Sequence, residues 1–263
     1  MRFSKLKKAS QVGAFFVFVF FSLQAAALCS TSEPLFRVKV AAVIDGDTLR
    51  LVDGRSVRLI GLNATEMGRN GRSAEPFAEA ARIRLQSLVN ANDGYVAIRL
   101  GQQPKDHYGR VLAHAFDGHG KNLEALMLLE GLGFFVAIAP NVSLAECQRA
   151  AEQQARSAGR GVWRQSSVIA AERVRSGGFA IVRARVERVE TNRGGIWLEL
   201  GGSFVVQIPR EAVARFDDAL VGLLGRHVEV RGWVIDRKGR ADLSRQARWL
   251  LRLSHPSMLE PLP

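Results

Sequence analysis

The chain has 263 residues, of which 47% are hydrophobic, and its formal net charge is +12. This hydrophobic fraction is normal for a chain with a folded core, so the composition excludes a wholly disordered protein. The length suits one large domain or two small ones. The positive charge favours polyanionic partners such as nucleic acid, but it also suits an anionic membrane surface, and charge alone identifies no chemistry.

The first 27 residues have the pattern of a secretory signal peptide. Residues 1–11 contain four basic and no acidic side chains, residues 12–23 are rich in Phe and Val, and residues 25–27 are three alanines. The apolar run is short for a membrane span, so a retained anchor is the weaker alternative, and we expect no stable span after cleavage. The mature chain then keeps a charge of +8 and is predicted to be periplasmic or secreted.

Export changes the interpretation of the two cysteines. In an oxidising compartment Cys29 and Cys147 can pair as a disulfide that ties the mature N-terminus to a helix, with free or intermolecular thiols as the alternative. The sequence has no CxxC pair or Cys/His cluster, and its five histidines are dispersed. The common zinc sites are therefore not expected.

A β-hairpin that carries polar groups is predicted within residues 43–66. Apolar and polar residues alternate on both sides of Asp53-Gly54, which is a strong hairpin-turn pair. Asp47 precedes the first strand and Arg58 interrupts the apolar pattern of the second. Oxygen ligands beside an arginine suit a hard cation and a phosphate. An ordinary turn followed by a salt-bridged surface arginine is the alternative interpretation.

The elements that follow predict a barrel. Helices are expected at residues 74–89, 122–130 and 144–157, and further strands at 95–100 and 111–116. Five strands with a helix between the third and the fourth are typical of an OB-type barrel with a helical flank. The predicted fold class is therefore mainly β with flanking helices (α+β).

The rest of the chain repeats this order of elements. Residues 164–176 are expected to form a polar helix or linker. Strands are then expected at residues 179–190, 196–200, 204–208, 227–236 and 249–253, with a helix at 211–224. The repetition predicts a second, smaller OB-like accessory domain over residues 177–263, although the two halves show no clear sequence repeat.

Four motifs occur in one order along the first half. They are Asp-Gly-Asp-Thr-Leu at 45–49, Val-Arg-Leu-Ile-Gly-Leu-Asn-Ala-Thr-Glu at 57–66, Asp-His-Tyr-Gly-Arg at 106–110 and Gly-Arg-Gly-Val-Trp at 159–163. Together they resemble the thermonuclease (staphylococcal-nuclease-like) family, and the likeness covers about residues 36–163 of a domain expected at 28–163. The resemblance implies an OB-fold of the staphylococcal-nuclease type that uses calcium to hydrolyse DNA and RNA, leaving 3′-phosphate and 5′-hydroxyl ends.

The resemblance also implies roles for single residues. Asp47 matches a direct carboxylate ligand of the calcium, and Ala64 matches a position that offers its backbone carbonyl. Glu66 matches an acid that contacts metal-bound water and activates the attacking water as a general base. Arg58 and Arg110 match two arginines that hold the phosphate and stabilise its charge in the transition state.

Several residues depart from the family pattern. Asn63 stands where a second aspartate ligand is usual, so we expect weaker calcium binding or an altered metal dependence. Ala137 and Ala139 are expected where two tyrosines often flank the substrate, so base stacking would be missing there. Tyr108 matches a phosphate-contacting tyrosine, whereas His107 stands where a lysine is expected.

The loops of the second domain offer further basic residues. The loops predicted to be hairpins carry Arg193, Arg237, Lys238 and Arg240. OB barrels often meet oligonucleotides at such loops, and solvated basic turns are an equal alternative. Trp197 and Trp233 can stack on bases, although packing between domains is the more frequent use of such tryptophans.

The sequence therefore predicts an exported calcium-dependent nuclease for DNA, RNA or both. The alternative is a nucleic-acid-binding protein of the cell envelope that has lost turnover through Asn63 and the missing tyrosines. The combination of Arg58, Glu66 and Arg110 favours the enzyme, because binding alone needs no positioned base.

Overall fold

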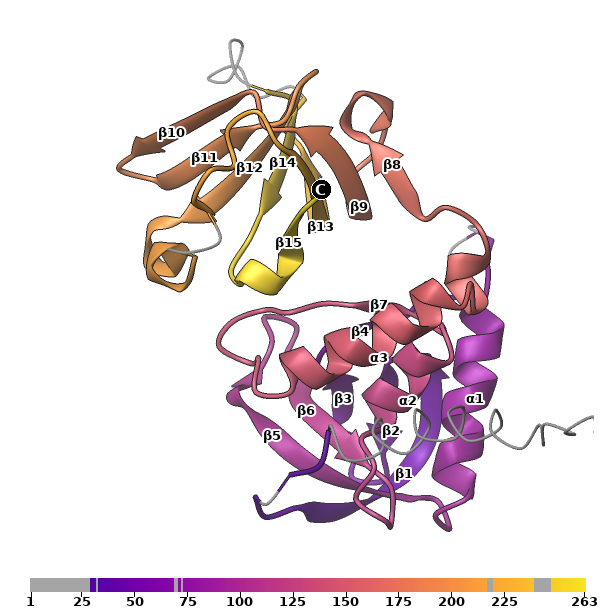
Figure 1. Ribbon diagram of the computed structural model, residues 1–263. Coiled ribbons are helices and arrows are strands. Elements are labelled where there is room, and N and C mark those ends of the chain that lie inside the picture. Colours follow the sequence, from indigo (N-terminus) through magenta and orange to yellow (C-terminus); the bar gives the residue numbers. More distant parts are fainter. Residues whose placement is uncertain (1–28, 32, 69–70, 72, 217–219, 239–246) are drawn as a thin grey trace, which may run out of the picture.

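The computed structural model describes residues 29–263 except 32, 69–70, 72, 217–219 and 239–246. The predicted signal peptide lies outside these residues. Within the described part, no helix is long and apolar enough to cross a membrane. Two β-rich units follow one another along the chain (Figure 1).

Five strands of the first unit close into a barrel with the spatial order β1-β2-β3-β6-β5. They are β1 (Phe36–Asp45), β2 (Thr48–Leu51), β3 (Ser56–Leu59), β5 (Tyr95–Lys105) and β6 (Val111–Phe116). Neighbouring strands are antiparallel except β3 and β6, which are parallel. This arrangement confirms the predicted OB-type barrel.

The hairpin of β2 and β3 positions the polar residues of the barrel. Gly54 takes a left-handed conformation (φ 87°), which the tight turn requires and which glycine adopts without steric cost. The register pairs Thr48 with Arg58. Arg58 therefore lies beside Asp47, the residue immediately before β2.

Three helices pack against the barrel (Figure 1). They are α1 (Ala78–Asn90), α2 (Leu123–Leu129) and α3 (Ala145–Ser157), and a 3-10 helix, η1 (Gly161–Arg164), follows α3. α2 and α3 confirm the predicted helices. α1 begins four residues later than predicted, because Phe77 before it has a left-handed backbone (φ 67°). Ile83 of this helix is 54% exposed.

Two short strands and a disulfide complete the first unit. β4 (Leu62–Asn63) pairs with β7 (Phe134–Phe135). Cys29 and Cys147 form a disulfide with their Cα atoms 5.5 Å apart. The bridge ties the segment before β1 to α3.

The second unit is built on one sheet with the order β10-β11-β12-β14-β13-β9-β8, and β15 pairs with β13. Its strands are β8 (Val168–Ala170), β9 (Gly178–Arg185), β10 (Arg188–Asn192), β11 (Gly195–Glu199), β12 (Phe204–Pro209), β13 (His227–Asp236), β14 (Trp249–Arg252) and β15 (Leu259–Pro261). Its 3-10 helices include η2 (Ala171–Arg173), η3 (Arg210–Arg215) and η6 (Pro256–Met258). β8 lies within the predicted linker and adds a parallel strand to β9.

If β9 and β10 are counted as one bent strand, the strands of this sheet have the same spatial order as the strands of the first barrel. Only residues 186 and 187 separate the two, and β9 pairs with β13 while β10 pairs with β11. In the first barrel, β1 likewise pairs with β5 through its first half and with β2 through its second. β12 and β14 are parallel, as β3 and β6 are. The second unit therefore has the strand order expected of an OB-like unit, in one eight-stranded sheet.

The helix predicted at residues 211–224 is wrong in the described part. The described residues of this range form no α-helix; they include the 3-10 helix η3, whose C-terminal flank at Phe216 is fully buried. The apolar residues of this segment are spaced as in an amphipathic helix, which explains the wrong prediction. The same spacing also occurs where a connection between strands buries single side chains against a sheet.

The two units meet through α3 and one face of β13. Arg156 and Glu229 pair at 2.6 Å, and Arg231 and Glu152 pair at 2.5 Å. The side chains of both glutamates are almost completely buried. Charges taken out of water in this way need their partners in place, so the pairs fix how the second unit sits on the first.

Candidate functional site

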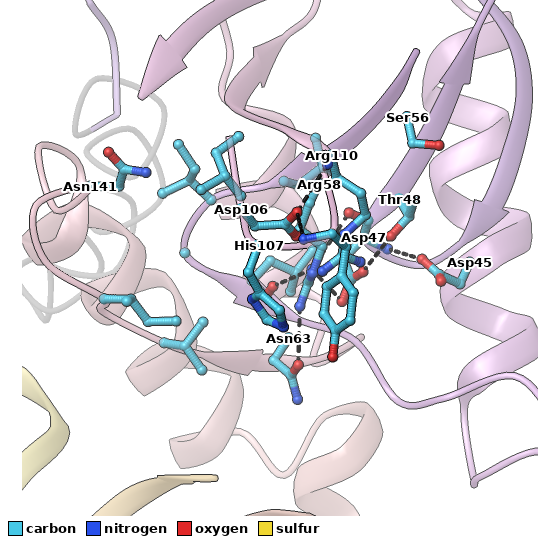
Figure 2. A pocket seen from close by; sticks show the side chains of 18 of the residues that line it. Asp45, Asp47, Thr48, Ser56, Arg58, Asn63, Asp106, His107, Arg110 and Asn141 are labelled. Carbon is cyan, nitrogen blue, oxygen red and sulfur yellow. Dashed lines mark hydrogen bonds and ion pairs between the residues drawn. The ribbon is translucent and has the colours of Figure 1, made fainter. Parts of the chain in front are cut away.

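A cavity of about 760 Å³ opens where β1 turns into β2. Its walls come from this turn, from β3, from the segment after β4 and from the turn between β5 and β6, and Figure 2 shows the polar side chains that converge there. The predicted site residues that line it are Asp47, Arg58, Asn63, Glu66, His107, Tyr108 and Arg110. The structure thus gathers residues from three separate motifs into one place. Ala64 is buried and does not line the cavity.

Asp47 and Arg58 form the centre of this group. Arg58 Nη1 lies 2.5 Å from Asp47 Oδ2 and donates to the carbonyl of Leu62 at 2.8 Å. Its other terminal nitrogen donates to Asn63 Oδ1 at 3.1 Å. The guanidinium is therefore held in place before any substrate arrives.

The carboxyl group of Asp47 lies in a poorly solvated position. Burial raises its pKa to about 7, and the negative charge of nearby Asp45 adds to this rise. The Arg58 guanidinium and the Ala64 N–H act in the opposite direction but do not cancel the effect of burial. This site therefore favours additional positive charge close to Asp47.

The loop after β4 is tied to the β1–β2 turn by a single carboxylate. The Ala64 N–H donates to Asp47 Oδ2 at 2.7 Å. A Cβ atom on Gly46 would lie 2.6 Å from the Cβ atoms of both Ala64 and Ala81, so this turn can approach the loop and α1 only because it carries glycine. Glu66, two residues after Ala64, is exposed at the cavity edge.

The turn between β5 and β6 presents Arg110 to the cavity. Asp106 Oδ1 accepts the backbone N–H groups of Tyr108 and Arg110, and Asp106 Oδ2 accepts Nε of Arg110 at 2.7 Å. Because the bond uses Nε, the two terminal nitrogens remain as donors for a substrate. Tyr108 is 74% exposed, and its ring centroid lies 3.7 Å from that of His107. Sequence reasoning had given Asp106 no role of its own; its spacing of four residues from Arg110 was the available signal.

Comparison with known proteins finds a family model and relatives that match the first unit of the chain. Residues 56–165 match the family model of staphylococcal nuclease homologues. Residues 56–165 therefore form a staphylococcal-nuclease-like domain. Endonuclease YncB of Bacillus subtilis (strain 168) is 29% identical over 141 residues, which cover 52% of this chain and 66% of that protein. A Thermonuclease of Staphylococcus intermedius is 36% identical over 83 residues, which cover 30% of this chain and 48% of that protein.

The donors of this nuclease-family site fit a hard cation only in part. Among the described residues, no group of three or more His, Cys, Asp or Glu side chains could hold a metal ion. Asp47 and Asn63 supply a carboxylate and an amide oxygen, and both already accept bonds from Arg58. Oxygen donors are those that Ca²⁺ prefers, but calcium takes six to eight of them. A cation here would need phosphate and water oxygens to complete its shell.

Other residues predicted to bind nucleic acid do not line this nuclease-family cavity. Arg193 and Lys238 are exposed on the second unit, outside the cavity lining. Arg237 is buried, and its guanidinium donates to the carbonyl of Ala247, which gives it a structural contact. Arg240 lies outside the described residues.

Two apolar features of the cavity differ from the sequence analysis. Ala137 is 2% exposed and donates its N–H to Met258 of the second unit, so it faces away from the cavity, whereas Ala139 lines it. Val136 and Ile138, the neighbours of Ala137 on either side, line the cavity, because successive side chains of extended chain point to opposite sides; Ala139 lies in the turn that follows. Trp233 of β13 also lines the cavity, although the prediction for it favoured packing between domains.

Proposed function

We propose that the chain is an exported, calcium-dependent nuclease that hydrolyses phosphodiester bonds of DNA, RNA or both. The observation that carries this proposal is the joint presence of Arg58, Arg110 and Glu66 on one cavity of a staphylococcal-nuclease-family barrel. Export is proposed from the signal-peptide pattern of residues 1–27. The chain matches only 66% and 48% of the two relatives' lengths, so their names support the reaction class and nothing finer.

The two arginines suit a phosphate. Each is anchored by a carboxylate, Arg58 by Asp47 at 2.5 Å and Arg110 by Asp106 at 2.7 Å. Donors that are already oriented stabilise the charge that develops on the phosphate oxygens without reorganising during the reaction. Planar guanidinium groups also match pairs of phosphate oxygens. Arg58 and Arg110 are therefore assigned to transition-state stabilisation.

Glu66 is assigned as the general base. Its exposed position at the cavity edge suits a carboxylate that takes a proton from water as the oxygen of that water attacks phosphorus. The bond from phosphorus to the 5′ oxygen then breaks and this oxygen takes a proton from solvent water, which leaves a 3′-phosphate and a 5′-hydroxyl end. Asp47, Asn63 and the carbonyl of Ala64 would hold the calcium ion, which when bound offsets negative charge on the phosphate.

The test is cleavage of single-stranded DNA by the mature chain across a calcium titration, with a chelator as the metal-free arm. Glu66→Gln should lower the rate about 10²–10⁴-fold, because it removes the proton acceptor and keeps the shape. Glu79→Gln is the matched control, since Glu79 lies on α1 and pairs with Arg82, outside the cavity lining. Salt-dependent binding without cleavage at every calcium concentration would refute the enzyme and favour the nucleic-acid-binding alternative.

A further inference from the structure

One residue of the cavity wall comes from the second OB unit. Trp233 lines the same cavity as Arg58 and Arg110, and it is 41% exposed. By contrast, Trp163 and Trp249 are 8% and 5% exposed. An indole on a cavity wall offers a flat apolar face that solvent does not satisfy, which is the property of a ligand-binding surface.

The position of Trp233 follows from the alternation of side chains along β13. Residues 229, 231 and 233 point to the same side of the strand, and this side faces the first unit. Glu229 and Arg231 use it to form the buried ion pairs with α3. Trp233 is the next residue on this side and reaches the cavity. The contacts that dock the second unit therefore also set the place of the indole.

Aromatic rings link Trp233 to the first unit. Its ring contacts that of Phe179 edge-on, with centroids 5.5 Å apart, and Phe179 lies 5.4 Å from Phe134 of β7. A side chain supported in this way is ordered before a ligand binds, so binding costs little further side-chain entropy. Ile138 and Val136 add apolar surface to the same cavity.

We propose that Trp233 is a stacking platform for an unpaired nucleobase of the polynucleotide whose phosphate Arg58 and Arg110 hold. The inference rests on the proposed function, because the charged end of the cavity selects a phosphodiester. Bases within a duplex are stacked on their neighbours, so only an unpaired base can lie on the indole. The second domain thereby selects single-stranded or locally unpaired nucleic acid.

The experiment measures binding separately from cleavage. Full-length mature protein carrying Glu66→Gln is titrated into a fluorescently labelled oligothymidylate, and into a labelled oligomer of equal length without bases. Trp233→Ala should weaken oligothymidylate binding about 5- to 150-fold, the range expected for one stacked base. Binding of the base-free oligomer should stay within about twofold, since Trp233 is assigned to the base and not to the phosphate.

Two further variants keep the result interpretable. Trp233→Phe retains an aromatic face and should bind much more tightly than Trp233→Ala, which separates stacking from damage to the domain contact. Trp197→Ala is the matched control, because Trp197 lies on β11 of the same unit, outside the cavity lining. It should bind like the parent. Thermal unfolding of each variant reports whether the fold is kept.

The outcomes distinguish this inference from the proposed function. If Trp233→Ala binds oligothymidylate as the parent does, or loses the base-free oligomer equally, the stacking role is overturned even when the wild-type chain cleaves DNA. If the wild-type chain does not cleave but Trp233→Ala still loses oligothymidylate selectively, the nuclease proposal fails and the stacking platform stands.

Discussion

Replacing Asp47 by asparagine should stabilise the protein at neutral pH, and the gain should grow with pH. Burial raises the pKa of Asp47 from 3.8 to about 7, so folding opposes ionisation of this carboxyl group. Well below pH 3.8 the group is protonated in both the folded and the unfolded chain and contributes no penalty. As the pH rises from about 4 to 7, the unfolded chain releases the proton first, and stability is lost.

The magnitude follows from the size of the pKa change. Each pH unit between the unfolded and folded pKa corresponds to about 1.4 kcal/mol, so a rise from 3.8 to about 7 corresponds to about 4 kcal/mol. Because Asp47 is only 6% exposed, solvent screening reduces this figure little. Asparagine keeps an oxygen that can accept the Ala64 N–H and carries no charge to bury, although it gives up the ion pair with Arg58.

The assay is urea unfolding of the parent and Asp47→Asn between pH 4 and 8, with chelator present because a cation would favour the ionised carboxylate. The difference in unfolding free energy should increase through this range and level off above pH 7. Asp236→Asn is the control: Arg248 holds the pKa of the exposed Asp236 at about 2, so its effect should not change between pH 5 and 8. A difference for Asp47→Asn that is equally flat would refute the reasoning.

Three further substitutions test other parts of the site and fold. Asn63→Asp should raise calcium affinity, measured by calorimetry, because it adds a charged oxygen ligand; unchanged affinity would remove Asn63 from the metal shell. Joint replacement of Cys29 and Cys147 by serine should lower the unfolding free energy by about 2–5 kcal/mol, measured by denaturant titration under oxidising conditions, because a bridge spanning 118 residues restricts the unfolded chain. Gly46→Ala should lower the melting temperature and calcium affinity together, since its methyl group would meet Ala64 at 2.6 Å; unchanged values would show that the turn relaxes.

The sequence was most informative about the first barrel and its charged residues. Turn chemistry at Asp53-Gly54 and the alternation around it are local signals, and they sufficed to place Arg58 beside Asp47. The β5–β6 turn depends on Asp106 and Gly109 within five residues, which is also a local signal, but the strand predicted at 95–100 continues to Lys105 in the structure. In the second unit, the sequence analysis expected the same order of elements, and the strands of its sheet follow that order.

Features that depend on contacts between distant segments could not be predicted in this way. The orientation of Ala137 away from the cavity could not be predicted, because the spacing of residues does not give the side to which each residue of an extended chain points. Ile138 occupies the cavity wall instead. The place of Trp233 depends on how two domains dock, and no local pattern reports that.

The docking of the second unit bears on the site itself, and the contacts of Glu152 explain how. This buried carboxylate pairs with Arg231 of the second unit and also accepts the backbone N–H of Phe135 at 2.7 Å. Phe135 pairs with Leu62 in the β4–β7 ladder, which carries Asn63 at the next position. Buried ion pairs add little to net stability, but loss of one partner leaves an uncompensated charge, so they enforce a particular arrangement. One carboxylate therefore fixes both the second unit and the short strand β4, which leads into the loop that carries Ala64 and Glu66.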